Sequence, residues 1–168
     1  MKARLVGFVC VVSLWLTSCV GGGYSMTGGD VGAAETISVA IFPNYSDYVN
    51  PQLSQAFTDQ LRQLFVQQTP LTLVSSGGDL HFEGSIIGYE ISAKAATNAE
   101  TTAQNRLTIS VNVIFTNELD TDKSFEQVFS RFRDFPADQD FSAVESQLVT
   151  EINRELSENI FNRALVNW

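Results

Sequence analysis

The chain has 168 residues, of which 44% are hydrophobic and 17% are charged, and its 10 Lys and Arg against 19 Asp and Glu give a net charge of −9. This length is typical of one domain with a self-standing hydrophobic core. The acidic balance makes nucleic acid and anionic membrane surfaces poor partners for the body as a whole, because both carry negative charge themselves, although a local basic spot could still bind an anion.

The first eighteen residues have the layout of a secretory signal peptide. Lys2 and Arg4 give a positive start, residues 5–15 form an almost unbroken apolar run, and small residues precede Cys19. The apolar run is shorter than the roughly 20 residues that a transmembrane helix needs. The segment 1–18 therefore predicts export followed by removal.

Cys19 determines how the exported chain is retained. Leu16-Thr17-Ser18-Cys19 resembles the bacterial lipobox, which implies a diacylglyceryl group on the thiol, cleavage before the cysteine, and acylation of the new amino terminus, for example with palmitate. Buried acyl chains stabilise membrane attachment by about 0.8 kcal/mol per CH₂. The alternative is an ordinary signal cut near Ser18, which would leave a free thiol in an oxidising compartment. We favour the lipoprotein.

The mature chain would have 150 residues and a net charge of −11, since 8 basic residues then face 19 acidic ones. Cys10 leaves with the signal, so no internal disulfide can form and the fold rests on its core. Residues 19–35 are predicted as the acylated cysteine and a flexible tether that includes the Gly21-Gly22-Gly23 run, and residues 36–168 as a single domain. No acidic cluster follows Cys19, which favours the periplasmic face of the outer membrane.

The first half of the domain predicts a strand, a helix and a second strand. Residues 36–42 alternate, with Ile37, Val39 and Ile41 expected on one face of a strand. Asn50-Pro51 has the composition of a helix start, and the amphipathic pattern that follows ends near residues 69–70. Residues 71–74 form a short apolar strand.

Three longer strands are predicted next. In residues 80–92 the apolar positions change parity beside Gly88, as a β-bulge would produce. Residues 93–105 are small and polar and are interpreted as a long, mobile hairpin tip. Residues 106–116 alternate cleanly, and residues 124–135 carry aromatic side chains on both faces, with Phe129 on one face and Phe132 beside Val128 on the other.

The chain closes with a long amphipathic helix from residue 142 to about residue 165, for which Ser142 and Glu145 fit a capping box. Two helices with one apolar face each and strands that alternate predict an α+β fold. We expect a two-layer sandwich, with both helices packed on one face of a mostly antiparallel four- to five-stranded sheet. The other face is expected to be open, with Ser, Thr and Asn and occasional aromatic side chains.

Catalytic signals are weak in this sequence. His81 is the single histidine and is interpreted as a surface or edge imidazole, because no second ligand stands at metal spacing. The turn carboxylates Asp120, Asp122, Asp138 and Asp140 do not match a calcium loop. We therefore predict no enzyme, no metal and no cofactor beyond the lipid on Cys19.

Several short motifs together resemble the LptE family of lipopolysaccharide-assembly lipoproteins. They lie, in order, at residues 23–28 (Gly-Tyr-Ser-x-Thr-Gly), 37–44 (Ile-Ser-Val-x-x-Phe-Pro-Asn), 49–58, 78–84 and 105–109, with a terminal Asn167-Trp168. The resemblance implies an α/β sandwich at the outer membrane that plugs and scaffolds the LptD-type β-barrel translocon and assists lipopolysaccharide assembly. The alternative is a periplasm-facing lipoprotein that binds another envelope protein or a small ligand without a barrel.

Some members of the family carry basic loop residues that contact lipid A, so the basic residues here are candidates for binding lipopolysaccharide. Lys94 and Arg106 flank the predicted tip, and Arg131 and Arg133 stand two residues apart on one face of their strand. The competing interpretation is that all four are solvated or paired with the abundant carboxylates.

Overall fold

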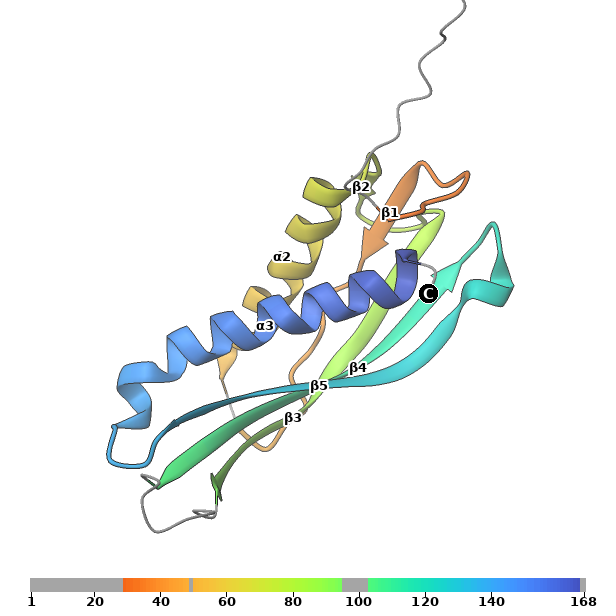
Figure 1. Ribbon diagram of the computed structural model, residues 1–168. Helices are drawn as coiled ribbons and strands as arrows, with labels where there is room; N and C mark the ends of the chain where they lie inside the picture. Colours follow the sequence, from red (N-terminus) through yellow and green to blue (C-terminus); the bar gives the residue numbers. More distant parts are fainter. Residues whose placement is uncertain (1–28, 49, 95–102, 167–168) are drawn as a thin grey trace, which may run out of the picture.

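The computed structural model describes residues 29–48, 50–94 and 103–166. The predictions for the signal peptide, for Cys19, for the tether up to residue 28 and for residues 95–102 of the tip lie outside the described residues. The described part consists of one sheet and two long helices (Figure 1).

The five strands are β1 (Thr36–Val39), β2 (Thr72–Val74), β3 (Leu80–Lys94), β4 (Gln104–Asn117) and β5 (Phe125–Pro136). They form one mixed sheet in the order β2-β1-β3-β4-β5. The pairs β3·β4 and β4·β5 are antiparallel, whereas β1 pairs in parallel with both β2 and β3. The meander of the three long strands β3, β4 and β5 is therefore antiparallel as predicted, and the two short strands β1 and β2 add parallel pairs at one edge.

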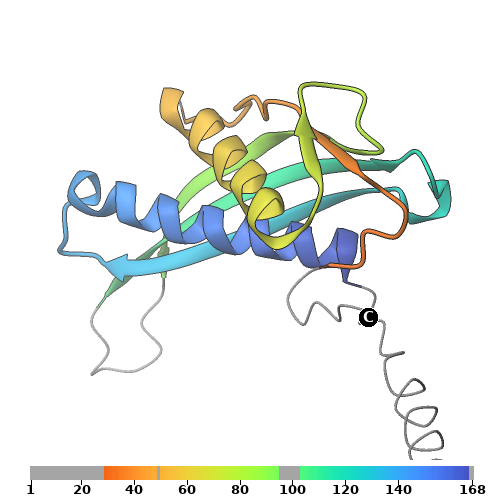
Figure 2. The same ribbon diagram turned by 90° about the horizontal axis from the view of Figure 1, so that it is seen from above.

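Both helices, α2 (Pro51–Gln68) and α3 (Phe141–Leu165), cover the same face of the sheet, as Figures 1 and 2 show from two directions. A short 3₁₀ turn, η1 (Thr121–Lys123), links β4 to β5. The predicted α+β two-layer sandwich is confirmed.

Aromatic rings fill the space between the sheet and the helices. Phe65 of α2 lies with its ring centroid 4.7 Å from that of Phe82 in β3 and 5.4 Å from that of Phe161 in α3, and Phe82 contacts Phe115 of β4 at 4.6 Å. Such pairs add about 0.5–1.5 kcal/mol each to the burial of their area. This row of rings fixes both helices to the middle of the sheet.

The predicted start of α2 is confirmed, whereas that of α3 is wrong in its details. Asn50 caps α2 through its side chain, which accepts from the N–H groups of Gln52 and Leu53, and Pro51 is the first helical residue. In α3 the cap is Asp140, whose carboxylate accepts from the N–H of Ser142. No capping box forms because the helix begins at Phe141, one residue before the serine that the sequence pattern favoured.

The first strand is shorter than its alternating pattern suggested. β1 ends at Val39, and the chain then turns so that Phe42 enters the core while Ile41 is 59% exposed. The N–H of Phe42 donates to the hydroxyl of Thr58 in α2, which holds the turn in place. The prediction that Ile41 shares a face with Ile37 and Val39 was therefore wrong, because the regular alternation ends at Val39, two residues before it.

The predicted β-bulge is confirmed, since the register between β3 and β4 shifts between Ile86 and Gly88. Both strands run further into the predicted tip than expected, with Lys94 still paired to Gln104. The meander is therefore one continuous ladder that extends well beyond the region covered by α2 (Figure 1).

The sheet face away from the helices carries small polar side chains and a few exposed apolar ones. Ser110 and Ser130 share a hydrogen bond of 3.0 Å across β4 and β5, and Asn112 of β4 donates diagonally to Glu126 of β5. Val128 and Phe132 project from this face with 53% and 45% of their surface exposed. The predicted polar face with occasional aromatics is present, and no described residue forms a second layer on it.

Candidate functional site

Basic side chains converge at the end of the β3–β4 hairpin. Lys94 from β3 and Arg106 from β4 both contact Asp134 of β5, which stands opposite Arg106 in the β4–β5 register. The Lys94 Nζ lies 2.9 Å from Asp134 Oδ2, and Arg106 donates from Nε to Oδ1 at 2.7 Å and from Nη2 to Oδ2 at 3.1 Å. The Arg106 guanidinium also lies 3.6 Å from the centre of the Phe132 ring. We call Lys94, Arg106, Phe132 and Asp134 the hairpin cluster.

The electrostatics of the hairpin cluster follow from this geometry. The hydrogen bonds from Arg106, assisted by Lys94, lower the pKa of Asp134 to about 2, although partial burial acts in the opposite direction. The bond to Asp134 raises the pKa of Arg106. Two cations and one carboxylate leave a net charge of +1. Because the Lys94 and Arg106 side chains are 43% and 31% exposed, their remaining N–H donors can reach an anion from solvent.

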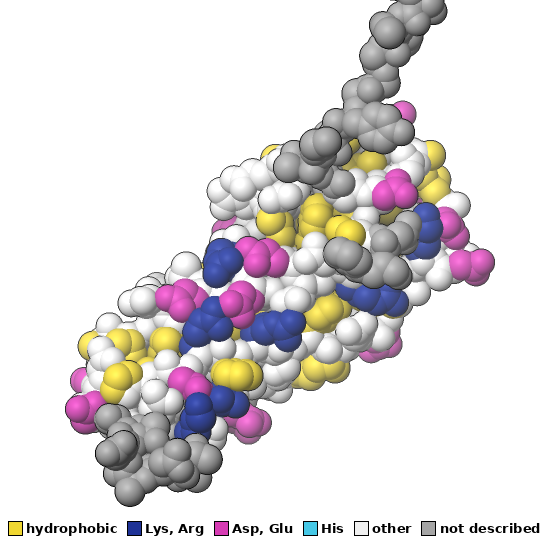
Figure 3. Space-filling view, viewed as in Figure 1, with side chains coloured by type: hydrophobic (Ala, Val, Ile, Leu, Met, Phe, Trp, Pro, Cys, Tyr) yellow, Lys and Arg dark blue, Asp and Glu magenta, His cyan; other side chains and the backbone are white. Residues whose placement is uncertain are grey.

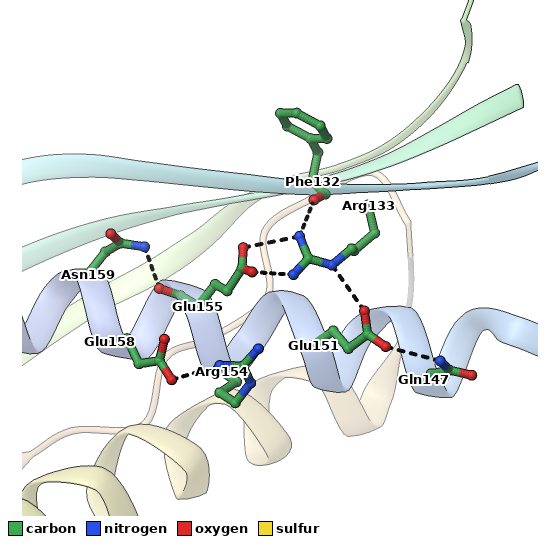
Figure 4. A network of polar contacts seen from close by, with 8 residues as sticks. All are labelled: Phe132, Arg133, Gln147, Glu151, Arg154, Glu155, Glu158 and Asn159. Carbon is green, nitrogen blue, oxygen red and sulfur yellow. Dashed lines mark hydrogen bonds and ion pairs between the residues drawn. The ribbon is translucent and has the colours of Figure 1, made fainter.

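Arg131 and Arg133 lie on the opposite face of the sheet. Arg133 points to α3, where its Nε donates to Glu151 at 3.0 Å and its two terminal nitrogens bond to Glu155 (Figure 4). The bonds from Arg133 lower the pKa of Glu155, and those from Gln147 and Arg133 lower the pKa of Glu151. This network ties the edge strand β5 to the middle of α3.

The four basic residues singled out in the sequence therefore belong to two separate places. Lys94 and Arg106 share the hairpin cluster, whereas Arg133 is surrounded by carboxylates and Arg131 makes no ion pair within the described part of the chain. On the face that Figure 3 shows, acidic and basic side chains are interspersed over α3 and its border with β5, and they do not gather in one basic patch.

His81 is part of a polar contact that the sequence did not indicate. Its Nδ1 lies 2.7 Å from the Ser38 hydroxyl of β1, and its Nε2 lies 3.7 Å from a Glu83 oxygen. A serine, a histidine and a carboxylate in contact can form a nucleophile, but the Ser38 side chain has no exposed surface and already accepts from the N–H of Gly78. A substrate carbonyl cannot reach this buried hydroxyl. The contact between Ser38 and His81 therefore has a structural role, which is to join strands β1 and β3.

Glu145 connects three elements at the amino-terminal ends of the helices. Its Oε1 accepts from the Asn50 side chain at 3.0 Å and from the Tyr89 hydroxyl at 2.8 Å. Burial and the bond to Glu145 raise the pKa of Tyr89, whose ring stacks on that of Tyr48 with centroids 4.6 Å apart. A cavity of about 230 Å³ lies beside Glu145, between α2 and α3. The carboxylate that the sequence assigned to a capping box instead joins α2, α3 and β3.

The described residues offer neither a metal-binding cluster nor a membrane-spanning helix. They contain no group of three or more His, Cys, Asp or Glu side chains that could hold a metal ion. Among them, no helix combines the length and the apolar composition needed to traverse a bilayer.

Two members of the hairpin cluster were not recognised as site residues in the sequence. The sequence pattern places Phe132 beside Val128 on one face of its strand and gives no separate signal for Asp134. Both could have been found by aligning the two antiparallel hairpins, since Arg106 then stands opposite Asp134 and beside Phe132.

Comparison with known proteins gives a match to one family model. The family model for LptE, described as lipopolysaccharide-assembly, matches residues 34–164, which is most of the chain. The search of curated proteins finds no match.

Solved structures share the fold at low sequence identity. A hypothetical protein from Chlamydia trachomatis has a TM-score of 0.57 at 8% identity, covering 80% of this chain and 100% of that one. A minor lipoprotein from Acinetobacter baumannii has a TM-score of 0.53 at 11% identity, covering 78% of this chain and 90% of that one. These likenesses support the two-layer fold alone.

Proposed function

The chain belongs to the LptE family of lipopolysaccharide-assembly proteins, and from this premise we propose that it plugs and scaffolds an LptD-type β-barrel at the outer membrane. The observation that carries the proposal is the family match over residues 34–164. The fold agrees with it, because both helices cover one sheet face while the other stays bare and can lie against a larger protein.

We propose Cys19 as the point of attachment to the membrane. The lipobox-like Leu16-Thr17-Ser18-Cys19 and the apolar run before it support acylation and a position on the periplasmic side of the outer membrane. Mass spectrometry of the protein purified from membranes is expected to show an acylated Cys19 at the amino terminus. An unmodified thiol on freely soluble protein would contradict the attachment.

We further propose that Lys94 and Arg106 contact an anionic group of lipopolysaccharide. Asp134 holds the Arg106 guanidinium through two hydrogen bonds, so the remaining donors are presented in a fixed orientation. Arg133 is a weaker candidate, because Glu151 and Glu155 already occupy its donors. Arg131, although partly available, faces away from the hairpin cluster.

Charge reversal tests this contact. The variant Lys94→Glu/Arg106→Glu is compared with Lys123→Glu/Arg154→Glu, which changes net charge equally at exposed positions. Binding of purified lipopolysaccharide is measured for each. We expect at least a tenfold weaker affinity for the hairpin variant alone. Equal affinities in the two variants would remove the proposed contact.

Depletion of the protein in the cell tests the role itself. Lipopolysaccharide exposed on the cell surface is quantified after synthesis of the chain is switched off, with a matched strain that is resupplied with it. We expect surface lipopolysaccharide to fall and to recover on resupply. Unchanged surface lipopolysaccharide would favour the alternative, a lipoprotein that binds another envelope protein or a small ligand without a barrel.

A further inference from the structure

The cavity of about 230 Å³ between α2 and α3 combines apolar and polar walls. It lies at the amino-terminal ends of both helices. Its buried lining residues, Leu53 and Val149, are apolar, and Ala56 adds a third apolar side chain. The other residues that line it carry amide, hydroxyl or carboxylate groups, namely Asn50, Gln52, Ser142, Glu145, Ser146 and Thr150.

Glu145 supplies the one charged group of this lining, and half of its carboxylate is available. The Asn50 side chain and the Tyr89 hydroxyl both donate to Oε1, which fixes the orientation of the carboxylate. Among the hydrogen bonds of the described residues, none involves Glu145 Oε2 or the hydroxyl groups of Ser142 and Ser146. The wall therefore presents an oriented acceptor and two hydroxyl groups to whatever enters the cavity.

The contact between the helices stays polar beyond the cavity. With 3.6 residues per turn, Ser146, Asn153 and Ser157 share one face of α3. This face looks toward α2, because Ser146 lines the cavity and Phe161, one turn after Ser157, contacts Phe65. Asn153 Oδ1 and Ser157 Oγ are buried and have no hydrogen-bond partner within residues 29–48, 50–94 and 103–166. Polar groups in need of partners thus continue behind the cavity.

The charges around the cavity favour a neutral ligand. No Lys or Arg is among the described residues that line it, so Glu145 would repel a phosphate or a carboxylate. The N–H groups of Gln52 and Ser142 are already capped by side chains, so they offer no anion site. A cation, in turn, would meet the positive ends of two helix dipoles.

We propose that this cavity binds one ring of a neutral sugar. Its hydroxyl groups donate to Glu145 Oε2 and accept from the two serine hydroxyls, while its C–H face packs on Leu53 and Val149. The volume is below the about 300–1,000 Å³ of pockets for drug-sized ligands, as suits a single ring. The site lies on the helix side of the sheet and does not rest on a barrel partner. Sugar binding and the proposed function can therefore fail separately.

A titration with simple sugars tests the inference. The acylated full chain, in a detergent without a sugar headgroup, is followed by NMR as glucose is added or, in a parallel sample, glucuronate, which is the same ring with a carboxylate. A ligand of about a dozen non-hydrogen atoms should bind with a Kd in about the millimolar range. We expect glucose to shift the amide signals of Ala56, Ser146 and Thr150 saturably, and glucuronate to bind about tenfold more weakly.

Maltose, which has two glucose rings, distinguishes the sources of such a sugar. Tighter binding of maltose than of glucose would identify a ring within a longer glycan. Weaker binding of maltose would identify a free monosaccharide. Either result, with glucose bound in the cavity, supports the proposal.

Matched variants connect the binding to the cavity. Ala56→Phe fills it from an exposed position, whereas Val66→Phe places the same ring at an exposed position further along α2. With both variants shown to be folded by urea unfolding, we expect only Ala56→Phe to abolish glucose binding. Glu145→Gln should weaken it about tenfold and remove the preference over glucuronate. Folded wild type without saturable shifts at the cavity would overturn the proposal, as would equal glucose binding by Ala56→Phe or equal affinities for glucose and glucuronate.

Discussion

Replacing Asp134 with Asn would remove the charge of the hairpin cluster's carboxylate while keeping its size. The pKa of Asp134 falls from an ordinary 3.8 to about 2 because Arg106 and Lys94 stabilise the ionised form. Such a difference corresponds to about 2.4 kcal/mol. Since the side chain is 21% exposed, solvent screening reduces the expected contribution to about 1 kcal/mol. We therefore expect Asp134→Asn to lower the free energy of unfolding by about 1 kcal/mol at pH 6.

The pH dependence of this loss is the sharper part of the prediction. The folded state has the lower pKa, so the stabilisation is fully present above the unfolded value near 3.8 and is lost as the pH falls through the folded value of about 2. Urea unfolding of wild type and Asp134→Asn from pH 6 to pH 2 should give a difference in the free energy of unfolding that shrinks steadily toward the acid end. Asp138→Asn removes an equal charge from an exposed turn, and its free energy of unfolding should differ little from that of the wild type at every pH.

Two results would refute the reasoning. If the free energy of unfolding differed between wild type and Asp134→Asn by the same amount at every pH, the carboxylate would act through its shape and not through its charge. An Asp134→Asn variant as stable as Asp138→Asn at pH 6 would mean that the contacts of Asp134 with Lys94 and Arg106 contribute nothing measurable.

Three further changes test the packing, each by urea unfolding. Phe65→Ala should lower the free energy of unfolding by about 3–5 kcal/mol because the ring is fully buried among other rings. Val66, on the same helix, is 52% exposed, so Val66→Ala should lower it by under about 0.5 kcal/mol. Equal losses in the two variants would contradict the proposed core. Asn50→Ala should cost about 1 kcal/mol through the lost cap of α2, and Gln52→Ala much less; no difference between them would argue against the cap. Gly84→Ala should cost about 3 kcal/mol, since its Cβ would stand 2.0 Å from a β4 carbonyl oxygen, and a stable variant would contradict that close approach.

Local patterns in the sequence predicted most of the elements, because their causes are local. The bulge beside Gly88 is visible as a change of parity, and the start of α2 at Asn50-Pro51 follows from the chemistry of helix caps. The separation of Phe129 from Phe132 likewise follows from the two-residue period of a strand.

The missed features depend on contacts between distant segments. Nothing in residues 36–42 indicates that β1 pairs in parallel or that Ile41 lies outside the core, because both depend on where β3 passes. Glu145 fitted a local capping pattern, but its actual partners are 95 and 56 residues away in the chain. The hairpin cluster required the register of both hairpins, which aligns Arg106 with Asp134 and places Arg133 on the other face.

The measurement that tests the central claim most directly is the native mass of the complex that the acylated chain forms in the outer membrane. The tagged protein is purified in mild detergent without crosslinking and weighed intact. The proposed plug predicts one copy of this 18.5 kDa chain, less its signal, bound to one much larger β-barrel. Acylated protein that emerges alone, at wild-type expression and with its fold intact, would contradict it.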